Sequence, residues 1–231
     1  MARVLVVQHL AGEGLGYFAD WLPAAGLDVH PIHPYLGHRV PAVVEGDALI
    51  VLGGPMSAYD DSRAPWLPAV RDLLTSAVED GVPTLGICLG AQLLALACGG
   101  RVESPAAAGP EIGVATVDVT VEDHLFTPRP IPVVAWHYDA VTTLPADSVV
   151  CASNAAYANQ AFRVGESAWG LQFHVETTLD MIRDWTSAAR EDLLADGFTP
   201  DDIVDDVRAA EPALTATGHE LAKRFAAVVT G

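Results

Sequence analysis

The chain has 231 residues, of which 51% are hydrophobic, and its 30 acidic residues outnumber 12 basic ones to give a formal net charge of −18. An apolar fraction this high excludes intrinsic disorder, and the length suits one domain whose core needs no disulfide or metal staple. The acid excess, with a single lysine, argues against nucleic acid or an anionic membrane as partner, because both bind clustered basic residues. No apolar run reaches the roughly 18 residues of a transmembrane helix.

The three cysteines, Cys88, Cys98 and Cys151, show no C-x-x-C spacing. We therefore expect neither a disulfide framework nor a thiolate metal site, and a reducing cytoplasm fits best. The first ten residues are interpreted as a strand rather than a signal peptide, because no convincing cleavage site follows them. Histidines at 30, 33 and 38 straddle prolines and a glycine and are expected in a loop, not at a metal.

The first half of the chain alternates short apolar runs with segments of helical periodicity. We expect strands at residues 3–8, 27–32, 47–52 and 82–87, and helices at 16–25, 65–79 and 89–98. A β-α-β-α order of this kind predicts a parallel sheet with helices on both of its faces.

The second half begins with many short β-rich runs, over residues 101–173, where antiparallel and mixed strands are expected. Helices return at about 179–195 and about 200–229, the last with Thr199 as N-cap and proline at its first position. We expect a single domain over 1–231, in which 186–231 is a helical C-terminal extension. The acidic stretch 180–211 is interpreted as a solvated face, with a docking face for a basic partner as the alternative.

The strongest chemical signal is the sequence GICLG at 86–90. A buried strand ends before Cys88 and a helix begins near Leu89, so the cysteine sits on a tight strand-to-helix turn of the nucleophile-elbow kind. The positive end of the helix favours a thiolate, and the backbone N–H of Leu89 points where an oxyanion would form. The alternative is a small buried hydrophobic residue at the end of a strand.

A nucleophilic cysteine needs a base, and one histidine stands out among eight. An expected strand at 168–173 runs into His174 and Glu176. In extended chain, residues i and i+2 point to the same side, so Glu176 can orient the ring of His174.

The glycine pair in GGPMS, at 53–57, follows another strand at the sheet edge where α/β proteins bind ligands, and the N–H of Gly54 can face the same oxyanion. Read alone, it is an ordinary β-turn.

In this order and spacing, GGPMS, GICLGAQ and LQFHVE resemble the motifs of class I (triad) glutamine amidotransferases, in particular the stand-alone GMP-synthase-like members. The resemblance runs over about residues 4–185 and includes PEIG (110–113), WHYD (136–139) and NQAFRVG (159–165). It implies the flavodoxin-like glutamine amidotransferase fold: α/β, with an open, mostly parallel central sheet flanked by helices and an antiparallel β-rich portion. It also implies hydrolysis of glutamine to glutamate and ammonia, without cofactor or metal.

The resemblance gives each catalytic position a role. Cys88 would attack the side-chain amide to form a γ-glutamyl thioester, His174 would relay protons, and Glu176 would orient His174. The N–H groups of Gly54 and Leu89 would form the oxyanion hole.

Three further positions, Gly53, Gln92 and His137, are expected to bind the substrate, although His137 can instead pack beside its tryptophan neighbour. Two residues depart from the family pattern: Val175 replaces the proline of H-P-E, and Tyr138 replaces a glycine of S-H-G-D. The first should leave the triad intact, whereas the second adds bulk near the pocket and puts the substrate in question.

The small-molecule substrate is therefore expected to be glutamine or another γ-glutamyl compound. No phosphate-binding loop of an ATP-pyrophosphatase occurs in these residues, so released ammonia would need a separate synthetase subunit, or the enzyme would be a simple hydrolase. A γ-glutamyl peptide hydrolase with the same triad is the main alternative. A non-catalytic regulatory subunit and a different cysteine hydrolase that uses a base such as His137 are the others.

Overall fold

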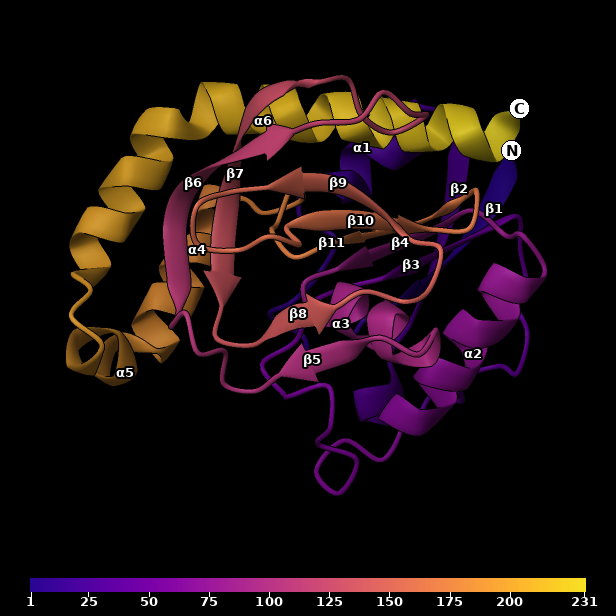
Figure 1. The fold of residues 1–231 in the computed structure, drawn as a ribbon, viewed down its shortest axis with the longest axis horizontal. Helices are drawn as coiled ribbons and strands as arrows, with labels where there is room; N and C mark the ends of the chain where they lie inside the picture. The colour runs from indigo at the N-terminus through magenta and orange to yellow at the C-terminus, as the bar shows by residue number, and fades with distance from the viewer.

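The computed structural model describes residues 1–231 and is built around a nine-stranded sheet of order β2-β1-β3-β4-β11-β10-β9-β6-β7 (Figure 1). Its parallel half comprises β1 (Ala2–Val7), β2 (Leu27–Ile32), β3 (Ala48–Val51), β4 (Thr84–Ile87) and β11 (Ala168–Leu171). Its antiparallel half comprises β6 (Glu111–Val119), β7 (Arg129–His137), β9 (Val149–Ser153) and β10 (Ala161–Val164). Strands β5 (Arg101–Glu103) and β8 (Ala140–Thr143) form a separate antiparallel pair.

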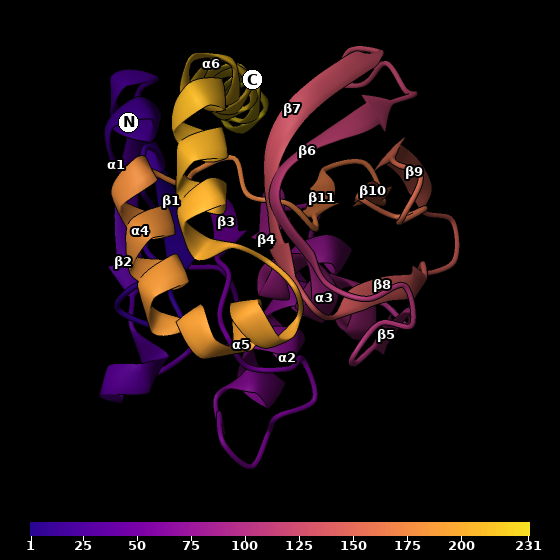
Figure 2. The same ribbon diagram turned by 90° about the vertical axis from the view of Figure 1, so that its left-hand side faces the viewer.

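The chain forms six α-helices, four of which cover the two faces of the sheet while two pack beside them. They are α1 (Phe18–Ala24), α2 (Leu67–Glu79), α3 (Leu89–Ala97), α4 (Leu179–Ala188), α5 (Arg190–Ala195) and α6 (Pro200–Thr230), with a short 3₁₀ turn, η1 (Pro34–Leu36). Helices α2 and α3 pack on one face, and α1 and α6 on the other. Figure 2 shows α4 and α6 side by side, next to α1.

Strand β1 explains how the two faces arise. Its side chains alternate, so Val4 and Val6 pack with α1 and α6, whereas Leu5 and Val7 pack with α2 and α3. All four side chains are buried, as expected for a parallel strand covered on both sides.

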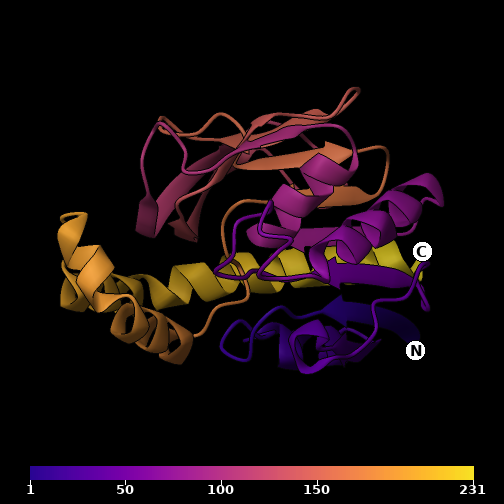
Figure 3. The same cartoon turned by 90° about the horizontal axis from the view of Figure 1, so that it is seen from below.

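The long helix α6 extends across the molecule, as seen from below in Figure 3. Its C-terminal part contributes Leu221 and Phe225 to the main core. Its N-terminal part contributes Ile203 and Val207 to a small separate core that also holds Trp185 of α4. The segment expected as an extension therefore packs against the sheet and supports α4.

The antiparallel strands expected within residues 101–173 are present: β6, β7, β9 and β10 continue the parallel sheet, and only β5 and β8 lie apart from it. Three details differ from the expectation. The helix expected at 179–195 is broken at Ala189 into α4 and α5. Thr199 caps α6, but its side chain makes no capping hydrogen bond. Cys98, expected within a helix, is the half-buried residue that ends α3. No helix is both long and apolar enough to cross a bilayer.

Candidate active site

A cleft of about 340 Å³ lies at the carboxyl ends of the parallel strands, where open α/β sheets bind their ligands. Each predicted motif reaches it from the end of a strand: the GGPMS loop follows β3, Cys88 follows β4, and His174 lies three residues beyond β11. Gly54, Cys88, Gln92, His137 and His174 all line this cleft. The structure thus brings together motifs that are far apart in the sequence.

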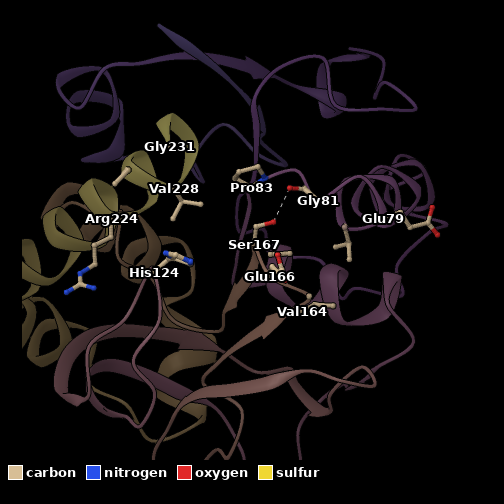
Figure 4. A pocket seen from close by; sticks show the side chains of 14 residues that line it. Glu79, Gly81, Pro83, His124, Val164, Glu166, Ser167, Arg224, Val228 and Gly231 are labelled. Atoms are coloured by element: carbon tan, nitrogen blue, oxygen red, sulfur yellow. Dashed lines mark hydrogen bonds between the residues drawn. The ribbon is translucent and has the colours of Figure 1, made fainter.

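A second cavity, of about 710 Å³, is larger but lies at the opposite edge of the sheet (Figure 4). Pro83 and Ser167, on its wall, directly precede β4 and β11, so it faces the amino ends of these strands. Ser167 Oγ donates to the carbonyl of Gly81, and the lining includes no cysteine. The smaller cleft is therefore the candidate active site.

Cys88 has the backbone strain of a nucleophile elbow. Its φ of 50° and ψ of −106° are unusual for a residue with a side chain, and strain of this kind gathers at functional sites. The flanking glycines make the turn sterically feasible. A Cβ at Gly86 would lie 2.5 Å from the carbonyl oxygen of Gly90, and one at Gly90 would lie 2.0 Å from that of Val51. Only glycine fits at both positions.

Cys88 is 7% exposed, and its thiol faces three partners from other elements. Its Sγ donates to the carbonyl oxygen of Trp136 at 3.7 Å and accepts from Nε2 of Gln172 at 3.9 Å. The third partner is His174, which is close enough for the thiol to influence its pKa. Cys88 is therefore largely shielded from solvent but lines the cleft.

His174 and Glu176 form the expected pair. Glu176 Oε1 lies 2.7 Å from His174 Nδ1, and both side chains are buried. The backbone of His174 is paired with Val134 of β7, which fixes the position of the ring. Val175, where the family pattern has proline, donates its N–H to Glu176 Oε2 at 2.9 Å, a bond that proline cannot make. Both carboxylate oxygens of Glu176 are thus held.

Opposing effects act on the pKa of His174. Burial alone would lower it, but the Glu176 carboxylate and Cys88 more than offset this, and the pKa of His174 lies well above its ordinary value of 6.5. The site therefore favours the imidazolium, the form that stabilises a nearby thiolate.

Gly54 and Leu89, the residues expected at the oxyanion hole, lie against each other. A Cβ at Gly54 would lie 2.9 Å from Cδ2 of Leu89. Leu89 is the first residue of α3, so its N–H has no partner within the helix. A Cβ at Gly53 would lie 3.1 Å from Cε1 of His174 and 3.6 Å from Cβ of Cys88. Gly53 is thus positioned beside both side chains.

Gln92 and His137 line the cleft but are already bonded to the protein. Nε2 of Gln92 donates to the carbonyl of Asp139 at 3.1 Å, which leaves its Oε1 as the free acceptor. His137 contacts the carbonyl of Asp139 through Nδ1 and the carboxylate of Glu111 through Nε2, both at 3.1 Å. With both ring nitrogens engaged, His137 can bind a substrate only through its ring edge or its backbone.

Two residues at the site were not predicted from the sequence. Glu13, in the loop between β1 and α1, lines the cleft beside His174. Trp185, on α4, lies with its ring 4.9 Å from that of His174. The signal for Glu13 was available, since it follows the carboxyl end of a parallel strand. No comparable signal marked Trp185.

The other two cysteines lie outside the cleft. Cys151 is fully buried in the core, and burial raises the pKa of its thiol to about 12. Burial also raises the pKa of Cys98. Neither thiol is activated, so Cys88 is the only candidate nucleophile among the cysteines. No group of three or more His, Cys, Asp or Glu side chains has an arrangement that could hold a metal ion.

The family model "Glutamine amidotransferase class-I" matches residues 26–183. The chain therefore belongs to the class I glutamine amidotransferase family, and the fold and the cysteine elbow agree with that assignment.

The chain is also similar to individual proteins of known sequence or structure. It is 30% identical over 207 residues to the glutamine amidotransferase-like protein YfeJ of Salmonella typhimurium, covering 83% of this chain and 82% of that protein. It is 35% identical over 152 residues to GMP synthase of Geobacillus kaustophilus, covering 64% of this chain but only 28% of that enzyme. A glutamine amidotransferase of Thermotoga maritima, 28% identical, superposes with a TM-score of 0.86 over 97% of both chains.

Proposed function

We propose that the protein hydrolyses the side-chain amide of glutamine through a γ-glutamyl thioester on Cys88, giving glutamate and ammonia. The observation that carries this proposal is the convergence, in one cleft, of a strained cysteine at a helix N-terminus with a buried histidine–carboxylate pair. This is the nucleophile, base and orienting group that acyl transfer requires.

In the first half of the reaction, the Cys88 thiolate attacks the amide carbon. The oxyanion that develops accepts hydrogen bonds from the N–H groups of Gly54 and Leu89. The His174 imidazolium gives its proton to the amide nitrogen, the C–N bond breaks, and ammonia leaves. The raised pKa of His174 suits this step, because it keeps the proton available at neutral pH.

In the second half, neutral His174 takes a proton from water, which attacks the thioester. The oxyanion forms again at the same N–H groups, the C–S bond breaks, and glutamate leaves. Glu176 holds the ring in one orientation throughout and stabilises its charged form.

Substrate binding is assigned to the groups around the nucleophile. Gln92 offers Oε1 to the glutamyl part of the substrate, and Gly53 permits close approach beside His174. We assign His137 to shaping the pocket wall, because both of its ring nitrogens are engaged.

The ammonia is proposed to serve a separate synthetase protein. One relative of similar extent is named as a subunit of the glutamine-hydrolysing GMP synthase of Picrophilus torridus, not as the whole enzyme. It is 32% identical over 137 residues, which cover 58% of this chain and 69% of that subunit. The acidic stretch 180–211 is one candidate docking face for such a partner.

Labelling with an electrophilic glutamine analogue tests the proposal. The probe should modify Cys88, and Cys88→Ala should abolish labelling and lower ammonia release by at least about 10⁵-fold, near the scale seen when a covalent nucleophile is removed. Cys98→Ser, at a half-buried thiol outside the cleft, is the matched control and should keep wild-type activity. Ammonia release that survives in the Cys88→Ala variant would overturn the mechanism.

A further inference from the structure

Glu13 is a third acidic side chain at the reaction centre, and the proposed mechanism does not use it. A Cβ placed at Gly53 would lie 3.4 Å from Oε2 of Glu13, 3.1 Å from Cε1 of His174 and 3.6 Å from Cβ of Cys88. Gly53 therefore lies at the point where the carboxyl, the base and the nucleophile meet.

The carboxyl of Glu13 differs from those of the other two glutamates near the cleft. Glu176 has both oxygens bonded, to His174 and to the N–H of Val175. Glu111 likewise has both oxygens bonded, by three side chains. No protein group forms a hydrogen bond or an ion pair with the carboxyl of Glu13, which lines the cleft. Its hydrogen-bonding capacity is available to a ligand.

The loop that carries Glu13 is fixed against the catalytic groups. The carbonyl oxygen of Gly12 accepts a hydrogen bond from Nε1 of Trp185 at 3.2 Å. The N–H of Tyr17 donates to the carbonyl oxygen of Glu176 at 2.7 Å, and a Cβ at Gly16 would lie 2.0 Å from that same oxygen. Glu13 is thus held in place rather than carried on a free loop.

The electrostatics of the cleft favour a positive ligand. Burial raises the pKa of Glu13 to about 7, an effect that the charge of His174 opposes and that of Glu176 adds to. Asp139 and Asp192 also line the cleft, and no lysine or arginine does. A cation placed beside Glu13 would stabilise its charged form, whereas an anion would be repelled by Glu13, Asp139 and Asp192 and would find a positive partner only in the His174 imidazolium.

We propose that Glu13 forms a leaving-group subsite that binds a positively charged amine. The inference rests on the proposed function: His174 protonates the departing nitrogen, and Glu13 lies beside the same ring in the same cleft. The preferred substrates are then γ-glutamyl amides in which the leaving amine carries a second nitrogen, present as an ammonium group. In the step itself the Cys88 S–C bond forms, the C–N bond breaks and the proton passes from His174 to the amine nitrogen, while Glu13 remains a carboxylate.

Three γ-glutamyl amides of matched length test this subsite. Their leaving amines are 1,3-diaminopropane, propylamine and β-alanine, which present a cation, a neutral methyl and an anion. For the wild type, kcat/KM for the cationic amide should exceed that for the anionic one by at least tenfold. Glu13→Gln should reduce this ratio at least tenfold, and Glu13→Asp, which keeps the charge, should preserve most of it. Glu45→Gln, an exposed carboxyl outside the cleft, should leave the ratio unchanged.

The possible results separate the inference from the proposed function. A wild-type ratio below ten, or a ratio unaffected by Glu13→Gln, overturns the subsite while hydrolysis persists. If the folded wild type releases neither ammonia from glutamine nor amine from any amide, the proposed function itself fails. Should Glu13→Gln not fold, inhibition of the wild type by the free amines decides the matter, since 1,3-diaminopropane must inhibit at least tenfold more strongly than propylamine.

Discussion

The indole of Trp185 packs edge-on against the imidazole of His174, with ring centroids 4.9 Å apart and an angle of 63° between the rings. The same indole donates its N–H to the carbonyl of Gly12, next to Glu13. One side chain of α4 therefore contacts both the proposed base and the loop of the proposed leaving-group subsite. The C-terminal helices thus support the active site, because α6 packs against α4.

Replacement of Trp185 should separate these two contacts. Trp185→Phe keeps an aromatic ring beside His174 but loses the N–H, so kcat for glutamine should fall only a few-fold. Trp185→Ala removes the ring from a buried position and should lower kcat by about 10- to 100-fold and stability by roughly 3–5 kcal/mol. Steady-state kinetics and urea unfolding measure both effects. Trp66→Phe, which loses a hydrogen bond to His9 away from His174, is the control, and unchanged kcat in Trp185→Ala would contradict the supporting role.

Glu176→Gln tests how the triad is charged. The Glu176 carboxylate helps to raise the pKa of His174, so its neutral amide should shift the His174 limb of the kcat/KM profile to lower pH. Loss of the charge should also reduce kcat on the order of 10²- to 10⁴-fold, less than removal of the nucleophile. A histidine whose pKa is raised on folding stabilises the folded state fully below its unfolded pKa of 6.5, and this stabilisation is lost as the pH rises through its pKa in the folded protein. The variant lacks part of this stabilisation, so below pH 6.5 it should be less stable than the wild type. An unchanged midpoint of the kcat/KM profile would show that the Glu176 carboxylate does not raise the pKa of His174.

Local patterns predicted which residues the candidate site brings together, and tertiary packing decided what surrounds them. The elbow at Cys88 and the pairing of His174 with Glu176 follow from glycine positions and the alternation of extended chain, both of which are visible in a few residues. Trp185 reaches Gly12 across 173 positions of sequence, and no local pattern encodes such a contact.

The fold shows the same contrast between what local sequence patterns predict and what depends on tertiary packing. Continuous apolar runs predicted the strands of the parallel half, because both faces of each are covered. The junction of the two halves is the hairpin of β10 and β11, in which Ala161 pairs with Leu171. Strand pairing depends on partners distant in sequence, so the continuation of one sheet through this hairpin was not predicted.

The elbow glycines should be intolerant of any side chain. Gly90→Ala would place a Cβ 2.0 Å from the carbonyl oxygen of Val51, which belongs to a buried strand and cannot move away. We expect a loss of several kcal/mol, in the upper range for overpacked cores, together with loss of activity because Cys88 is displaced. Gly12→Ala is the matched control, since nothing lies within 4 Å of its added Cβ. Thermal unfolding measures the difference in stability between the two variants. Equal melting temperatures would show that the elbow tolerates a Cβ at position 90.

His9 should make the protein sensitive to mild acid. Its side chain is fully buried, Nδ1 accepts from Nε1 of Trp66 at 3.0 Å, and burial lowers the pKa of His9 to about 4. A depressed pKa contributes stability above the unfolded value of 6.5 that is lost as pH falls toward 4, because the unfolded chain binds the proton first. Between pH 7 and pH 5 this should cost about 2 kcal/mol. Urea unfolding at the two pH values should show a smaller loss for His9→Gln than for the wild type, while His124→Gln, at an exposed position, should behave as the wild type does. Equal losses in wild type and His9→Gln would assign the acid sensitivity to other groups.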